Sequence, residues 1–386
     1  MSEYKTIGDY AEAFSGFAFS SGDLVDEGVP VIKIGNIQNG EVIQECDSFY
    51  QKEITENLKR YILDSNDFLI AMTGAGSVGR AGKMRGVIET VYLVNQRVAI
   101  VRTRDNVNPN YLFYFFSLPY VERYLYSLGI GAGQPNISAK DIMKIKVTFP
   151  DKKIQNKIAD ILVTYDELID CNNKRIKILE QMAENLYKEW FVRFRFPGHE
   201  DAEFENGIPK GWEIHRLGEI SDFAYGKMPS QEHLLEDEEG YPIFSGYRVN
   251  GYYDSYMYED SKLVLIARGV GGTGDVAKSP PKSYITNLSI IFNLKNETLL
   301  KEYLYQRFKI QNLRYLDTGA AQSQITIDNL RRVKVIIPTE HILCDYKKIN
   351  NSISCEMRII NQKNENLIRQ RDLLLPRLMS GKLEIK

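Results

Sequence analysis

An internal repeat constrains the fold of this chain more than any other feature of its sequence. Phe68–Gly79 matches Leu263–Gly274, and Lys144–Pro150 matches Arg332–Pro338. The offset between matching segments falls from 195 to 188 between these two places. Such a drift is expected of two homologous units that differ in loop length, whereas a solenoid repeats at a short fixed period. The 386 residues are therefore predicted to be one unit written twice.

Each copy begins with a segment that is typical of a β-rich domain. Short apolar runs such as Val29–Ile34, Phe68–Met72 and Leu263–Ala267 alternate with Gly, Asn and Asp turns, as strands do. One short helix per copy is expected, at Tyr111–Ser127 and at Leu300–Leu316. Each copy then ends with one more strand and a proline.

A long helix is predicted after each of these prolines. Residues 154–190 contain neither Gly nor Pro, and apolar residues recur there at alternating spacings of three and four, as in the a/d seam of a coiled coil. So long a seam needs a partner helix, and the other copy is the obvious candidate, in antiparallel orientation. Two unrelated surface helices are the alternative. The residues expected in helix pairing or partner binding are Ile158, Ile161, Tyr165, Leu168, Leu179, Leu186, Ile349, Ile353, Ile360, Leu367 and Leu374.

The predicted fold class is α+β, with two β-rich domains in pseudo-twofold repeat joined by two long antiparallel coiled-coil helices. The expected segments are a first domain at 1–150, a central helix at 151–195, a second domain at 196–340 and a C-terminal helix at 341–386.

The overall charge gives no reason to expect a polyanion as partner. With 49 basic and 51 acidic side chains the net charge is −2, so any nucleic acid must be bound by local patches. Four cysteines without a C-x-x-C pair, a polar N-terminus and the absence of a long apolar stretch predict a soluble, cytoplasmic protein.

Two glycine-rich turns, Gly74–Gly79 and Gly269–Gly274, match G-x-G-x-x-G. Neither is followed by a segment that can begin a helix, so dinucleotide binding is disfavoured. Basic residues flank both turns, which suits phosphate contact in a loop; an ordinary hairpin with solvated charges is the alternative. The flanking residues are Arg80, Lys83, Arg85, Arg268, Lys278 and Lys282.

A second pair of repeated loops, Gln134–Ser138 and Gln322–Thr326, carries side-chain amides that suit bidentate contact to adenine. Ser138 and Thr326 are equally well placed to cap the next helix. The aromatic, glycine-rich stretch Phe244–Tyr253 adds a third candidate surface. The predicted DNA-binding residues are Thr73, Arg80, Lys83, Gln134, Asn136, Tyr247, Arg248, Arg268, Gln322 and Gln324.

Catalytic signatures are missing from the sequence. It contains no G-x-x-x-x-G-K-[ST], H-E-x-x-H or G-x-S-x-G, and no Asn-Pro-Pro-Tyr motif of amino-methyltransferases. The four histidines are scattered. We therefore expect a binding protein, with no catalytic residue, no metal and no cofactor of its own.

The whole chain resembles the specificity subunit of type I restriction–modification systems. Asn185–Phe194 is similar to the segment that closes the central helix in this family, and Leu373–Ile385 is similar to its C-terminal ending. Gly207–Glu213 resembles the opening of a target-recognition domain, an opening that the first domain lacks.

This resemblance implies that each domain reads one half of a split target in double-stranded DNA, and that the helices set the gap. It also implies two methyltransferase (modification) subunits docked on the helices, which bring S-adenosylmethionine, and restriction subunits, which bring ATP and Mg. No membrane is involved. Two alternatives are a DNA-recognition module that serves a different enzyme outside restriction, and a self-contained nucleotide-dependent enzyme.

Overall fold

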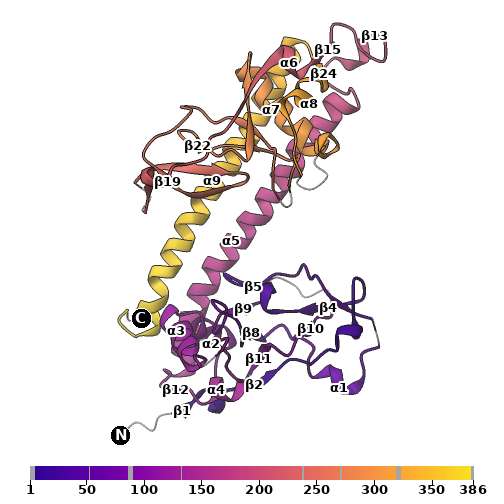
Figure 1. The fold of residues 1–386 in the computed structure, drawn as a ribbon. Helices are drawn as coiled ribbons and strands as arrows, with labels where there is room; N and C mark the ends of the chain where they lie inside the picture. The colour runs from indigo at the N-terminus through magenta and orange to yellow at the C-terminus, as the bar shows by residue number, and fades with distance from the viewer. Residues whose placement is uncertain are drawn as a thin grey trace. The chain divides into compact units, whose positions relative to one another are not determined.

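The chain forms two compact units. The computed structural model describes residues 5–51, 53–85, 90–131, 133–236, 239–269, 272–318 and 323–383. The first unit comprises residues 1–171 with 363–386, and the second comprises residues 172–362 (Figure 1). Each unit therefore contains one globular domain together with a part of each long helix.

The first unit contains three sheets. The largest has the order β2-β11-β8-β9-β6-β5, a four-stranded sheet has the order β10-β4-β7-β3, and β1 pairs with β12. The strands are β1 (Lys5–Thr6), β2 (Ala11–Ser15), β3 (Leu24–Val25), β4 (Val29–Ile32), β5 (Ile37–Gln38), β6 (Gly40–Val42), β7 (Phe49–Tyr50), β8 (Phe68–Ala71), β9 (Ala81–Lys83), β10 (Leu93–Val94), β11 (Val98–Thr103) and β12 (Lys146–Val147).

The second unit repeats this design. Its sheets have the orders β16-β23-β20-β21 and β17-β19-β18-β22, and β15 pairs with β24. The strands are β13 (Phe204–Glu205), β14 (Ile208–Pro209), β15 (Glu213–Arg216), β16 (Ser221–Tyr225), β17 (Leu234–Leu235), β18 (Tyr241–Ser245), β19 (Arg248–Tyr253), β20 (Leu263–Ile266), β21 (Val276–Lys278), β22 (Tyr284–Ile285), β23 (Ser289–Leu294) and β24 (Lys334–Ile337).

The two domains share one topology. The order β2-β11-β8-β9 in the first corresponds to β16-β23-β20-β21 in the second, and every neighbouring pair in both is antiparallel. In both, the four-stranded sheet contains one parallel pair, β10 with β4 and β22 with β18. This agreement confirms the predicted repeat of two β-rich domains.

The helices differ from the sequence prediction in the first domain. One helix was expected at 111–127, but α2 ends at Phe116 and α3 begins at Pro119. Proline has no N–H to donate and is favoured at the first position of a helix, so it starts a new one here. The helices are α1 (Glu56–Lys59), α2 (Pro109–Phe116), α3 (Pro119–Leu128), α4 (Ala139–Met143), α5 (Lys152–Tyr187), α6 (Leu217–Ile220), α7 (Glu297–Ile310), α8 (Ile327–Arg331) and α9 (Glu340–Met379).

The two long helices, α5 and α9, run antiparallel beside one another. In the second unit Arg175 forms an ion pair with Glu356 at 2.7 Å, while the rings of Tyr187 and Tyr346 lie 6.5 Å apart. In the first unit Arg371 of α9 lies 2.6 Å from Asp166 of α5. The pairing confirms the predicted helical part of the fold.

Both helices contribute to the core of each domain. In the first unit, Ile158 and Leu162 of α5 and Leu375 and Leu378 of α9 are buried in the same apolar cluster as the sheet. In the second unit the corresponding cluster contains Tyr187, Trp190, Ile342 and Tyr346. The apolar core of each domain is therefore complete only when both helices pack against it.

Two of the residues predicted for helix pairing or partner binding lie outside the helix seam, so only partner binding stays a prediction for them. Leu168 and Ile349 are 49% and 43% exposed, whereas their neighbours Ile169 and Asn350 are buried. At the second position the buried residue is the polar Asn350, so a pattern built on apolar residues alone selects the adjacent Ile349. Of the other predicted residues, Ile158, Ile353 and Ile360 are buried, and the remainder are half-buried: Ile161, Tyr165, Leu179, Leu186, Leu367 and Leu374.

Two buried tyrosines of the second unit predict opposite effects of removing a hydroxyl. Tyr303 donates to the carbonyl oxygen of Ile336 at 2.5 Å, whereas the Tyr346 hydroxyl has no hydrogen-bond partner among the described residues. Tyr303→Phe is expected to lower the free energy of unfolding by about 1 kcal/mol, and Tyr346→Phe to leave it unchanged or raise it by up to about 1 kcal/mol. Urea unfolding of both variants measures this. A larger loss in Tyr346→Phe than in Tyr303→Phe would contradict the prediction.

Candidate nucleic-acid interface

The first glycine-rich turn closes the hairpin of β8 and β9. The N–H of Gly79 donates to the carbonyl oxygen of Ala71 at 2.9 Å. Gly79 has a φ of +86°, and a Cβ at this position would lie 2.8 Å from the carbonyl oxygen of Glu122 in α3. A glycine is required because the turn approaches α3 so closely. Since β9 follows at Ala81, the turn does not lead into a helix, as predicted.

The second glycine-rich turn has the same construction. Gly274 donates to the carbonyl oxygen of Ile266 at 2.9 Å, and β21 follows. Its φ is +96°, and a Cβ would lie 2.4 Å from the backbone nitrogen of Arg314. The two turns are therefore equivalent in backbone geometry at their last glycine, although their flanking side chains differ.

In each domain the glutamine-containing loop lies against the start of the glycine-rich turn. In the first, Thr73 forms an isolated β-bridge with Asn136, and the N–H of Ile137 donates to Met72 at 2.9 Å. In the second, Arg268 forms the equivalent bridge with Gln324. We call these paired loops, residues 73–79 with 134–136 and residues 268, 269 and 272–274 with 324, the loop surfaces of the two domains.

The side chains of the loop surfaces differ in exposure. Gln134 and Asn136 are exposed, while Thr73, Arg268 and Gln324 are half-buried. Gln322 lies outside the described residues. The expected helix caps are confirmed, because the side chain of Ser138 accepts from the N–H of Asp141, and that of Thr326 accepts from the N–H of Asn329.

Most basic side chains that flank the turns contact groups of their own domain. Arg80 donates to the carbonyl oxygens of Ile37 and Gly76 at 3.1 and 2.6 Å. Lys83 donates to Asn110 at 2.6 Å, and burial lowers its pKa. Each side chain thus has at least one donor engaged inside the domain, and the phosphate contacts expected of both stay predictions.

The remaining flanking cations, other than Arg268, are paired with carboxylates. Lys278, which corresponds to Lys83 in the repeat, lies 2.9 Å from Glu302, and Lys282 lies 3.2 Å from Glu259. The Arg85 side chain lies 3.1 Å from Asp170. The solvated-hairpin alternative is wrong for Lys278 and Arg85, which form partly buried ion pairs.

Arg268 is the exception among these cations. Its Nε is buried without a hydrogen-bond partner among the described residues, and its guanidinium lies 5.6 Å from the centre of the Tyr225 ring. The adjacent bridge to Gln324 holds the backbone in place. Arg268 therefore has a buried donor that no described group of its own domain uses.

Tyr247 and Arg248 lie at the turn between β18 and β19, and both are exposed. The Tyr247 hydroxyl donates to the carboxylate of Asp275, which also accepts from the side chain of Asn312. Burial and this hydrogen bond raise the pKa of Tyr247, so the phenol remains a donor. Asp275 thus ties the Tyr247 turn to the glycine-rich turn.

Sequence reasoning missed Asp275, although the repeat contained a signal for it. Asp275 follows the last glycine of its turn, as Arg80 does in the first domain. Both side chains hold a neighbouring hairpin, Arg80 through the carbonyl oxygen of Ile37 and Asp275 through Tyr247. Arg80 and Asp275 occupy the same position of the repeat, and each supports a neighbouring hairpin although their charges are opposite.

The described part of the chain gives little support to a metal site or to a membrane-spanning helix. Within it, no group of three or more His, Cys, Asp or Glu side chains is arranged to hold a metal ion. No helix in the described ranges is both long and apolar enough to cross a membrane.

Two domains of one topology, each with an equivalent loop surface, define a protein with two related binding domains. The family model of the type I restriction modification DNA specificity domain matches residues 1–181 and 209–368. The chain therefore belongs to the family of type I restriction–modification specificity subunits, as the sequence resemblance predicted.

Individual relatives agree with this assignment. The chain is 26% identical over 341 residues to the type I restriction enzyme MjaIX specificity subunit of Methanocaldococcus jannaschii, which covers 82% of this chain and 78% of that protein. It is 21% identical over 438 residues to the HindI specificity subunit of Haemophilus influenzae, with 92% and 94% covered. The crystal structure of a type I restriction–modification S subunit from M. genitalium has the same fold, with a TM-score of 0.58 and 16% identity over 100% of this chain and 96% of that one.

Proposed function

We propose that this chain is the DNA-recognition subunit of a type I restriction–modification complex and that each domain reads one half of a bipartite duplex target. One observation carries this proposal. The two loop surfaces share a backbone bridge but present different side chains, Thr73 with Asn136 and Arg268 with Gln324. The same backbone arrangement with different side-chain donors and acceptors suits two half-sites of different sequence.

The chain supplies recognition and none of the chemistry in this proposal. S-adenosylmethionine, ATP and Mg belong to partner subunits, and the helix pair sets the gap between the half-sites and docks two modification subunits. Exposed apolar side chains on the helices support a docking role, because such residues mark contact surfaces. These are Ile154, Leu168, Ile178 and Met182 on α5 and Ile349, Ile359, Ile368 and Leu373 on α9.

Selection from a pool of randomised duplexes tests the proposal. The chain is purified together with the modification subunits of its own system, and bound DNA is sequenced. We expect two short defined motifs separated by a gap of constant length and free sequence. A single continuous motif, or no enrichment, would contradict the bipartite assignment. Binding of the chain to a different enzyme, with none to modification subunits, would place it outside restriction.

Arg268→Ala is expected to weaken DNA binding and to reduce its dependence on salt. A side chain that contacts one phosphate releases about one counterion, so the slope of log K against log [salt] should fall by about 0.9. Fluorescence anisotropy of the complex on its target duplex across a salt series measures both quantities.

Lys83→Met is the matched control for Arg268→Ala. It also removes one positive charge, but the Lys83 ammonium is bound to Asn110 inside the first domain. Its salt slope should remain that of the unchanged protein. If the slope of log K against log [salt] were the same in Arg268→Ala and the unchanged protein, Arg268 would contact no phosphate and its role would be structural.

A further inference from the structure

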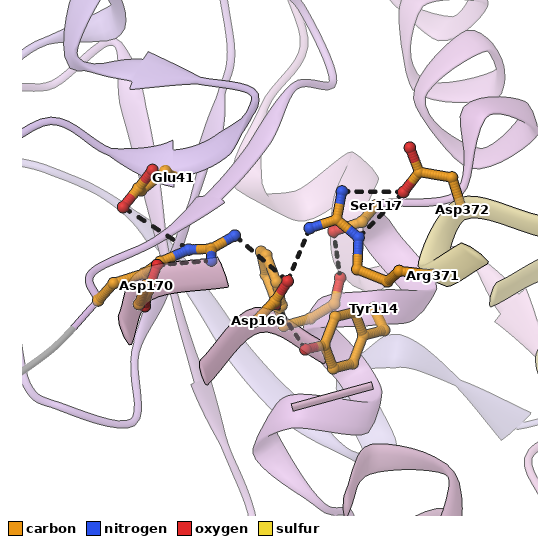
Figure 2. Close-up of polar contacts among 9 residues, drawn as sticks. Glu41, Tyr114, Ser117, Asp166, Asp170, Arg371 and Asp372 are labelled. Atoms are coloured by element: carbon orange, nitrogen blue, oxygen red, sulfur yellow. Dashed lines mark hydrogen bonds and ion pairs between the residues drawn. The ribbon is translucent and has the colours of Figure 1, made fainter. Parts of the chain in front are cut away.

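A partly buried carboxylate joins the first domain to both long helices. Asp166 of α5 is 15% exposed and lies 2.6 Å from Arg371 of α9. Its second oxygen accepts from the Tyr114 hydroxyl of α2 at 2.7 Å, as Figure 2 shows. Burial and the carboxylate raise the pKa of Tyr114, so the phenol stays protonated and donates. Asp166 of α5 thus has partners in two other helices of the first unit, α2 and α9.

Arg85 extends this network to the strands that carry the recognition loops. It follows β9 and lies 3.5 Å from Asp166, 3.1 Å from Asp170 and 3.6 Å from Glu41 of β6. Figure 2 shows Glu41 and Asp170 on the left of this network and Asp166 near its centre. With Arg85 and Arg371 only 17% and 19% exposed, water and salt screen these charges less than surface pairs.

The second unit has uncharged residues at four of the positions of this network. The repeat offsets place Pro280, Gln306, Ser354 and Ala183 where the first unit has Arg85, Tyr114, Asp166 and Arg371. The second domain is joined to the helices by aromatic contacts and by a hydrogen bond in which the Asn350 amide of α9 donates to Glu302 of α7 at 3.1 Å. The Phe191 ring lies 4.8 Å from both Tyr303 and Tyr346. The two domains are therefore attached to the same helix pair by different chemistry.

We propose that Asp166 is a positioning residue that fixes the first domain on the helix pair and thereby restricts the complex to one gap length. This inference rests on the proposed bipartite reading. Helix length sets the distance available between the half-sites, but a domain that could tilt on its helices would also accept neighbouring gaps. Asp166 opposes such a tilt because it binds the domain through Tyr114 and Arg85 and the second helix through Arg371.

The test compares Asp166→Asn with the unchanged protein, each in complex with modification subunits. Methylation rates are measured on duplexes that carry both native half-sites at the native gap and at gaps one base pair shorter and longer. We expect the preference of Asp166→Asn for the native gap to fall by about tenfold, with the half-site sequences unchanged. Asp166→Glu should restore part of the preference. Asp160→Asn, an equal loss of charge at an exposed position of α5, should leave it intact.

Arg85→Gln provides a second, milder variant, because it leaves the Asp166–Arg371 pair in place. It should also relax the gap preference, and it keeps the test decisive if Asp166→Asn does not fold, as judged by circular dichroism. An undiminished gap preference in a folded Asp166→Asn or Arg85→Gln complex would overturn the inference. If the unchanged complex shows no bipartite preference, the proposed function itself fails, which is a different result.

Discussion

Exchange of residues 1–150 for the corresponding domain of another specificity subunit is expected to change one half of the DNA target and to leave the other half as it was. The whole first loop surface, including Thr73, Gln134 and Asn136, lies within this segment, and none of the second does. Each mismatched base pair costs about 1–3 kcal/mol, so a half-site of a few base pairs should lose at least about a hundredfold in preference. Sequencing of methylated DNA from cells that contain the chimeric complex measures this.

The donor domain must fit the helices as well as carry new loops. Ile158, Leu162, Leu375 and Leu378 pack against the first domain, so a chimera with a poor core would lose binding altogether. The reciprocal exchange of residues 196–340 serves as the control and should change only the other half. A change in both halves after either exchange would refute the modular assignment.

Removal of seven residues from each long helix is expected to shorten the gap while both half-sites persist. Residues 172–178 of α5 and 356–362 of α9 are suitable, because they include the facing pair Arg175 and Glu356. Seven residues shorten a helix by about 10 Å. Since duplex DNA rises about 3.4 Å per base pair, the gap should fall by about three base pairs. Because seven residues make two full helical turns, the deletion also keeps the apolar stripe of each helix facing its partner.

A deletion in α5 alone is the control for this experiment. It shifts the apolar stripe of one helix along the other, so loss of folding or of complex formation is expected. If the matched deletion gave a folded complex with an unchanged gap, the helices would not act as the spacer. Methylation mapping on a library of gap lengths distinguishes the two results.

The sequence was sufficient to predict the parts of the fold that depend on local patterns. Glycines at a turn, a Ser or Thr before a helix and apolar alternation are each determined within a few residues. The hairpins at Gly79 and Gly274 and the caps at Ser138 and Thr326 therefore agree with prediction. The repeat added long-range information, because two copies with matching segments must have matching topology.

The partners of charged side chains could not be predicted in the same way. Lys83 and Arg85 are close in sequence to a turn that looked exposed, but their partners Asn110 and Asp170 come from distant segments. Only the tertiary fold decides whether a cation meets solvent or a carboxylate. The prediction that Ile349 is buried failed for a related reason. The neighbouring Asn350 is buried although it is polar, so polarity does not predict exposure there.

Comparison of two single substitutions, Asn136→Ala in the first loop surface and Gln324→Ala in the second, tests the central claim most directly. Each variant is placed in the complex, and the methylated motifs are determined by sequencing. The account predicts that Asn136→Ala relaxes base preference in one half of the target only and Gln324→Ala in the other half only. Relaxation of the same half by both variants, or an unchanged motif in both, would contradict the assignment of one half-site to each domain.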